Sequence, residues 1–170
     1  RLQTALEQTR LAGIASNLGF LAAIAGNEAF LAGDLHTGFI DEHAADLIPA
    51  AATADREVLG AAVLSILASR TTSAADPWDE RTAWRMNLPP REIFVLKDGD
   101  TERRVTVNHA PSLTIEIDGE SLPAAFAQEA NGDLAVSLGG VRSSVHVFTE
   151  GETSTVLRRG HAHKLELVQA

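Results

Sequence analysis

The chain has 170 residues, of which 14 are basic and 23 acidic, and it contains no cysteine. The formal charge of −9 opposes contact with nucleic acid phosphates, and the lack of cysteine excludes disulfides, thiol catalysis and zinc–thiolate sites. An apolar content of 45% is typical of a globular protein, and the length allows one domain, or one domain and part of another.

The N-terminal segment, residues 1–48, predicts short helices with some extended chain. Residues 2–9 fit the last turns of an amphipathic helix, which Gly13 interrupts, and residues 14–15 fit a short strand. Asn17 can cap the helix that follows. Further helical pieces are expected at residues 28–31 and 39–43. With so few long elements, this segment has little core of its own and is expected to be the edge of a larger domain.

A helix is predicted at residues 53–70, after a linker of one proline and three alanines at residues 49–52. Thr53 can cap its N-terminus. Residues 58–69 contain no charged side chain and are apolar on nearly every side, and a helix of that kind must be enclosed by protein. The run is too short to cross a bilayer, which needs about 20 apolar residues. The core side chains expected from this helix are Val58, Leu59, Val63, Ile66 and Leu67.

After residue 90 the pattern changes to short segments in which apolar and polar residues alternate, as expected of strands. These segments are residues 93–96, 104–107, 113–117, 134–138, 141–148, 153–157 and 165–167. Asp-Gly, Asn-Gly and Gly-Gly pairs between them predict tight turns. The segments follow one another too closely for helical crossovers, so we expect antiparallel pairing.

The two patterns together predict an α+β fold. We expect an antiparallel β-barrel of seven or eight strands around a central apolar helix, preceded by the small mixed helical segment. A barrel with an apolar interior and a helix that needs enclosure bury each other's surfaces, and closing the sheet removes its exposed edges. Residues 53–170 are therefore expected to form the barrel domain.

Residues 71–90 connect the helix to the first strand, and they hold both tryptophans and the single methionine of the chain. Trp, Met and Arg are enriched at protein interfaces, where large rigid side chains gain contact area at low entropic cost. The partner-contact residues predicted here are Trp78, Arg81, Trp84, Arg85 and Met86. The alternative for Trp84 is that its ring closes one end of the barrel, which makes Trp78, beside Pro77, the better interface residue.

Other clusters of polar residues give weaker signals. His161 and His163 could face one side of a strand, but the sequence offers no evident third metal ligand, and solvent-facing histidines are more common. His36, Asp41, Glu42 and His43 lie close together in sequence and fit solvated loop residues better than a metal site. A calcium site at Asp76, Asp79 and Glu80 is not supported either, because these residues lack the spacing of an EF-hand. We predict no catalytic residue, cofactor-binding residue or metal ligand in this chain.

Several stretches of the N-terminal segment follow one another in a defined order. Residues 12–17 are AGIASN, residues 29–34 are AFLAGD, and residues 37–40 are TGFI, followed by His43. This order resembles the end of the biotin carboxylase domain in α subunits of biotin-dependent acyl-CoA carboxylases, in particular 3-methylcrotonyl-CoA carboxylases. Residues 53–168, by order of elements and by the sequence WRMN at residues 84–87, resemble the BT domain of these subunits, an antiparallel barrel around a central helix.

The resemblance implies a parent protein that is a ligase, carboxylating biotin with ATP and Mg²⁺ and then an acyl-CoA. It also implies that residues 71–90 form a hook that contacts the carboxyltransferase β subunit. The chain would then be a non-catalytic scaffold between that subunit and its own biotin carboxylase and biotinyl domains. It lacks the Ala-Met-Lys-Met motif for biotin attachment, and the family's nucleotide site would precede Arg1, so we expect neither activity nor a bound cofactor here.

A chain that opens on Arg1 and carries no signal peptide is expected to be a piece of a cytoplasmic, bacterial-type protein without a membrane partner. The alternative function is a stand-alone barrel that binds a small ligand or another protein. Against a ligand site, we expect the helix to fill the barrel and to leave no cavity. The sequence does not select one acyl-CoA, because the resemblance places substrate choice in the partner subunit.

Overall fold

The structure is a computed structural model that describes residues 1–14, 16–48, 53–73, 90–158 and 161–169. Two compact units divide the chain. One unit comprises residues 1–53 with 157–162, and the other comprises residues 54–156 with 163–170.

The N-terminal segment consists of short helices. These are α1 (Leu2–Gln8), α2 (Leu18–Gly26), α3 (Glu28–Ala32), α4 (Phe39–Glu42) and α5 (Ala44–Leu47). Asn27 caps α3, because its side-chain oxygen accepts from the backbone N–H groups of the second and third residues that follow it. The strand expected at residues 14–15 is wrong at Ile14, which lies in a bend with 67% of its surface exposed, while residue 15 falls outside the described residues.

The predicted central helix is α6 (Arg56–Ser73), which begins and ends three residues later than expected. Thr53 does not cap it. Asp55 does, since its Oδ1 accepts from the backbone N–H of Val58 at 2.9 Å, the reach of an N-cap side chain to the third helical residue. Val58, Leu59 and Val63 are at most 1% exposed and Leu67 is 7% exposed. Ile66 is only partly buried and packs against this core.

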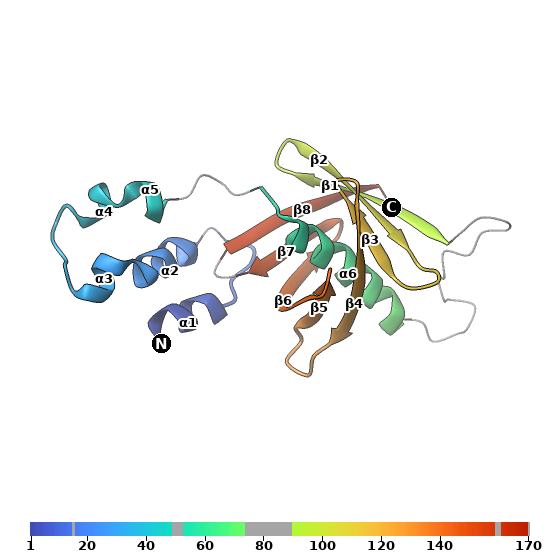
Figure 1. The fold of residues 1–170 in the computed structure, drawn as a ribbon, viewed down its shortest axis with the longest axis horizontal. Helices are drawn as coiled ribbons and strands as arrows, with labels where there is room; N and C mark the ends of the chain where they lie inside the picture. The colour runs from blue at the N-terminus through green and yellow to red at the C-terminus, as the bar shows by residue number, and fades with distance from the viewer. Residues whose placement is uncertain (15, 49–52, 74–89, 159–160, 170) are drawn as a thin grey trace. The chain divides into compact units, whose positions relative to one another are not determined.

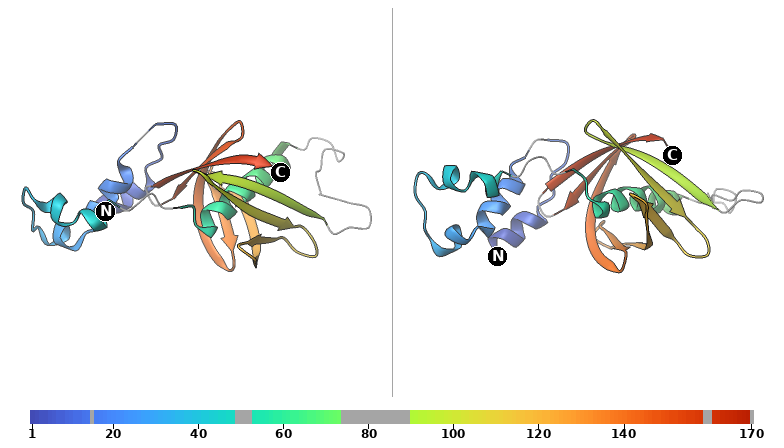
Figure 2. Two further views of the ribbon diagram at one scale, coloured as in Figure 1. Left: turned by 90° about the horizontal axis from the view of Figure 1, so that it is seen from above. Right: turned by 45° about the horizontal axis from the view of Figure 1, so that its top comes forward.

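Eight antiparallel strands form a closed barrel in which each strand pairs with the next and β1 pairs with β8. The strands are β1 (Arg91–Asp98), β2 (Thr101–Asn108), β3 (Thr114–Ile117), β4 (Glu120–Gln128), β5 (Leu134–Leu138), β6 (Val141–Glu150), β7 (Thr153–Arg158) and β8 (His161–Gln169). The predicted α+β fold class is thus confirmed. Figure 1 shows α6 running between the strands, and the two views of Figure 2 show it enclosed from other directions.

β4 is the strand that the sequence pattern did not reveal. It pairs with β3 over residues 120–123 and with β5 over residues 124–128. Pro123 stands where the strand passes from one pairing to the other, which is a position that tolerates a residue without a backbone donor. The inward side chains Leu122 and Phe126 are partly buried against the core.

The inward faces of the strands and α6 share one apolar core. The register places Phe94 of β1 opposite Val105 of β2, and Val105 opposite Ile117 of β3, all 0% exposed. Gly60 lets the helix approach β5 closely, because a Cβ atom there would lie 2.9 Å from Leu138 Cδ2. This core fixes the direction of α6, and with it the place where the chain leaves the barrel toward residues 74–89.

Candidate functional site

The residues predicted to contact a partner all lie outside the described part of the chain. They are Trp78, Arg81, Trp84, Arg85 and Met86. The structure does describe the end of the barrel from which this segment departs and to which it returns, since α6 ends at Ser73 and β1 begins at Arg91. We call the side chains Arg70, Glu92, Phe94 and His109 the barrel mouth.

Glu92 is the centre of the barrel mouth. It lies two residues before Phe94 on β1, so its side chain shares the inward face of that strand. Its Oε2 accepts from Arg70 Nη1 at 2.6 Å, and its Oε1 lies 2.8 Å from His109 Nε2. The guanidinium carbon of Arg70 lies 5.4 Å from the centre of the Phe94 ring. One carboxylate therefore joins the last turn of α6 to the segment that follows β2.

These charges are shielded from water more than ordinary surface ion pairs are. The Glu92 side chain is 17% exposed, against 53% for Glu120 in its ion pair with Arg56 at the other end of α6. Partial burial weakens solvent screening, but it also penalises a carboxylate that is left alone. The ion pair with Arg70 and the contact with His109 meet that requirement, because each of the two carboxylate oxygens has a partner.

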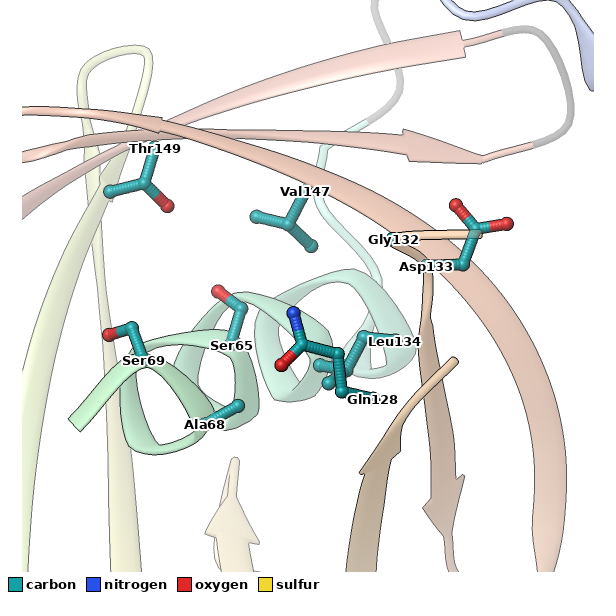
Figure 3. A pocket seen from close by; sticks show the side chains of 9 residues that line it. All are labelled: Ser65, Ala68, Ser69, Gln128, Gly132, Asp133, Leu134, Val147 and Thr149. Atoms are coloured by element: carbon teal, nitrogen blue, oxygen red, sulfur yellow. The ribbon is translucent and has the colours of Figure 1, made fainter. Parts of the chain in front are cut away.

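A second candidate is a hollow of about 460 Å³ between the C-terminal half of α6 and the barrel wall. Figure 3 shows Ser65, Ala68 and Ser69 on the helix, with Val147 and Thr149 of β6 across from them. The other lining residues are Gln128, Gly132, Asp133 and Leu134. The expectation that the helix leaves no cavity is therefore wrong, because small side chains at positions 65, 68 and 69 leave the space beside them unfilled.

The two serine hydroxyls of this hollow are engaged within the helix. Ser65 Oγ donates to the carbonyl of Ala62 at 2.7 Å, and Ser69 Oγ donates to the carbonyl of Ile66 at 2.8 Å. Hydroxyls that donate to their own helix have no base beside them to take the proton, which is what an activated serine nucleophile needs. The hollow is thus a space with polar walls, without a nucleophile–base pair among its described lining residues.

The hollow should accept a larger helix side chain. Ala68→Leu should leave the free energy of unfolding within about 1 kcal/mol of the wild type, whereas Ala62→Leu, in the packed core, should destabilise by about 1–3 kcal/mol. Urea unfolding of the two variants measures both values. Equal destabilisation by the two leucines would show that the space beside Ala68 has no room for a larger side chain.

A contact between a buried carboxylate and a histidine on the same side of the barrel was not predicted. Asp133 Oδ1 lies 2.6 Å from His146 Nδ1, and Asp133 Oδ2 accepts from Asn131 Nδ2 at 3.0 Å. The Asp133 side chain is 9% exposed. The contact ties the β4–β5 turn to β6. The Asn131-Gly132 turn was the available signal, but the pairing of β5 with β6 is needed to bring His146 to it.

The remaining polar groups of the sequence analysis do not assemble into a centre. His161 and His163 both lie on β8, and within the residues that the structure describes no cluster of three or more His, Asp or Glu side chains could hold a metal ion. His36 pairs with exposed Glu42 at 3.0 Å, and the His43 ring packs on Phe39 at 4.9 Å. Asp76, Asp79 and Glu80 fall outside the described residues, and Asp41 is exposed.

The helices in the described ranges include no segment with the length and apolarity to span a membrane.

Comparisons with known proteins connect the barrel to one family. A family model described as methylcrotonyl-CoA carboxylase, alpha-subunit, BT domain matches residues 54–170. The protein "Methylcrotonoyl-CoA carboxylase subunit alpha, mitochondrial" of Mus musculus is 29% identical over 133 residues, which cover 71% of this chain and 18% of that protein. The Rattus norvegicus protein of the same name is 26% identical over 132 residues, with the same two coverages. The chain thus spans 18% of the length of these relatives.

Proposed function

This chain belongs to the BT-domain family of methylcrotonyl-CoA carboxylase alpha subunits, and we propose that it is a non-catalytic scaffold through which the alpha subunit contacts its carboxyltransferase partner. The resemblance deduced from the sequence is confirmed for the barrel. That residues 1–48 are the end of a biotin carboxylase domain stays a prediction.

The enclosed helix is the observation that carries this proposal. From Val58 to Leu64 the apolar side chains of α6 are at most 1% exposed, so the interior of the barrel serves its own stability. A closed barrel of this kind is a rigid support, and its surface and connecting segments are what it offers to other proteins. The Trp, Arg and Met residues of 74–89 are the residue types that such an interface uses.

For the parent protein we propose the activity of the family, carboxylation of biotin with ATP and Mg²⁺ followed by carboxylation of an acyl-CoA such as 3-methylcrotonyl-CoA. In this proposal biotin, ATP and Mg²⁺ bind to other parts of the parent, and the chain works beside its biotin carboxylase and biotinyl domains. The relatives named above are mitochondrial proteins, and the cytoplasmic, bacterial-type location stays a prediction.

Substitution of two residues in segment 74–89 by alanine tests the proposal. In the full-length alpha subunit, Trp78→Ala combined with Arg81→Ala should weaken assembly with the carboxyltransferase β subunit by about 2 kcal/mol, roughly thirtyfold, because Trp and Arg dominate interface energies. Biolayer interferometry with immobilised β subunit measures the loss. ATP-dependent carboxylation of free biotin by the same variant should continue at its original rate.

A matched control removes one aromatic ring and one arginine from the barrel wall. Phe148→Ala combined with Arg142→Ala changes two exposed side chains of β6, and β-subunit binding should stay unchanged. The proposal fails if the Trp78 and Arg81 variant assembles normally while the 170-residue chain carrying it unfolds at a lower temperature. Those two residues would then belong to the barrel core.

The alternative function, a barrel that binds a small ligand, draws its support from the hollow beside Ser65 and Ser69. Ala68→Leu separates the two functions, because it occupies that space and leaves the sequence of residues 74–89 unchanged. An alpha subunit with this substitution that still binds the β subunit but no longer supports acyl-CoA carboxylation would favour the ligand-binding function.

A further inference from the structure

We infer that Asn131 is a site of spontaneous chemical modification, where the side-chain amide becomes a carboxylate by deamidation, and that the contact between Asp133 and His146 keeps this reaction slow. Of the asparagines in the chain, Asn131 is the only one followed by glycine. It lies between β4 and β5, and both Asn131 and Gly132 are exposed to the water that the reaction consumes.

The reaction is an attack of the backbone on the neighbouring side chain. The backbone nitrogen of Gly132 gives its proton to hydroxide and forms a bond to Cγ of Asn131. The bond between Cγ and Nδ2 then breaks, and Nδ2 takes up a proton from water and leaves as ammonia. Water opens the resulting cyclic imide to aspartate, or to the isomer whose backbone continues through the side-chain carbon. Glycine favours the attack because it carries no Cβ atom beside the attacking nitrogen.

The folded turn restrains both reacting groups. The backbone N–H of Gly132 donates to the carbonyl oxygen of Glu129 at 3.0 Å. Asn131 Oδ1 accepts from the backbone N–H of Asp133 at 2.9 Å, and Asn131 Nδ2 donates to Asp133 Oδ2 at 3.0 Å. The reaction needs a deprotonated nitrogen and an amide that is free to move, so these hydrogen bonds have to break first. It therefore proceeds from a locally opened turn, and its rate follows the population of that open state.

His146 stabilises the closed state of the turn. Its Nδ1 lies 2.6 Å from Asp133 Oδ1, while the other carboxylate oxygen of Asp133 accepts from Asn131. The Asp133 side chain is 9% exposed, and the His146 ring packs edge-on against Phe148. The imidazole thus holds the carboxylate that holds the amide. Hydrogen bonds to charged groups are stronger than those between neutral groups, so losing this contact should enlarge the open population about tenfold.

The product of the reaction should weaken the same turn. A carboxylate at position 131 replaces the Nδ2 donor by an oxygen that repels the Asp133 carboxylate. Asn131→Asp copies this product, and it should lower the melting temperature more than Asn131→Ala, which removes the donor without adding a charge. Equal melting temperatures of the two variants would overturn this part of the inference. Gly132 and Asp133 also line the hollow beside α6, so the modification adds a negative charge next to it.

Mass spectrometry of proteolytic peptides tests the site and its restraint. The 170-residue chain is kept at mildly alkaline pH, either folded in buffer or unfolded in guanidinium chloride. The replacement of NH2 by OH is followed over time in the peptide that contains Asn131. The unfolded chain should react at least about tenfold faster than the folded chain. His146→Phe keeps an aromatic ring but loses the contact with Asp133, and it should accelerate the reaction of the folded chain about tenfold.

The matched control is His109→Phe, which removes a histidine–carboxylate contact of the same kind, with Glu92, outside the strands that carry this turn. It should leave the rate at Asn131 unchanged. Equal acceleration by both phenylalanines would overturn the inference, and so would equal rates in the folded and unfolded wild type or an unreactive Asn131 in the unfolded chain. If circular dichroism shows that His146→Phe does not fold, Asp133→Ala must accelerate the reaction in a folded chain for the inference to stand.

Discussion

Leu64→Asp should prevent the barrel from folding. Leu64 is 0% exposed and lies on α6 at the centre of the core, among side chains that are apolar on every side. A carboxylate at that place would lose its hydration without gaining a hydrogen-bond or charge partner, and the cost exceeds the stability of an ordinary domain. Far-UV circular dichroism and a missing thermal transition would record the loss of the fold.

Truncating core side chains to alanine gives a measurable change in the free energy of unfolding. Leu64→Ala should reduce the free energy of unfolding by about 2–5 kcal/mol, the usual range for emptying a tightly packed site. Ile66→Ala, two positions away on the same helix, should reduce it by less, because Ile66 is only partly buried. The enclosed-helix architecture would be refuted by a Leu64→Asp variant with the melting temperature of the wild type, or by an Ile66 substitution more damaging than that of Leu64.

The sequence predicts this barrel well wherever apolar residues alternate strictly. Leu113, Ile115 and Ile117 alternate with polar residues, and Ile115 and Ile117 are indeed buried on the inward face of β3. The segment that became β4 has Pro123 and four alanines or glutamines in place of β-branched residues, so its composition does not favour a strand. Its neighbours in space determine its conformation, because the first part of β4 pairs with β3 and the second part pairs with β5.

The candidate site depends on contacts that no local pattern contains. Neither Glu92 nor His109 stood out in the sequence. Their meeting requires the register of β1 against β2 and the enclosure of α6, both of which are long-range consequences of the core. The same holds for Asp133 and His146, which the pairing of β5 with β6 brings to 2.6 Å.

The composition of α6 also explains why the helix could be predicted while the hollow beside it could not. The absence of charge over residues 58–69 indicates enclosure, but it does not say how far the wall stands from each side chain. Ala61 and Ala62 are 0% exposed, whereas Ala68 lines a space of about 460 Å³. The difference lies in the strands that face each alanine, because the packing of an identical side chain depends on what surrounds it.

Phe94→Ala should have the second largest effect, a loss of about 3–5 kcal/mol in the free energy of unfolding. Phe94 is a fully buried aromatic ring that joins the core to the barrel mouth, since one face lies 5.4 Å beneath the Arg70 guanidinium. The substitution leaves a cavity in the core and also removes the cation–π contact. Urea unfolding at constant m-value measures the loss.

The matched control for that ring is Phe148→Ala on β6. Phe148 is 40% exposed and meets the His146 ring edge at a centroid distance of 4.5 Å, so its removal should cost about 1 kcal/mol at most. If the two substitutions reduce the free energy of unfolding equally, the end of the barrel at Glu92 is open to water. The Glu92 carboxylate would then not be shielded from solvent. If Phe94→Ala alone is severe, the ring supports both the core and the Arg70 side chain above it.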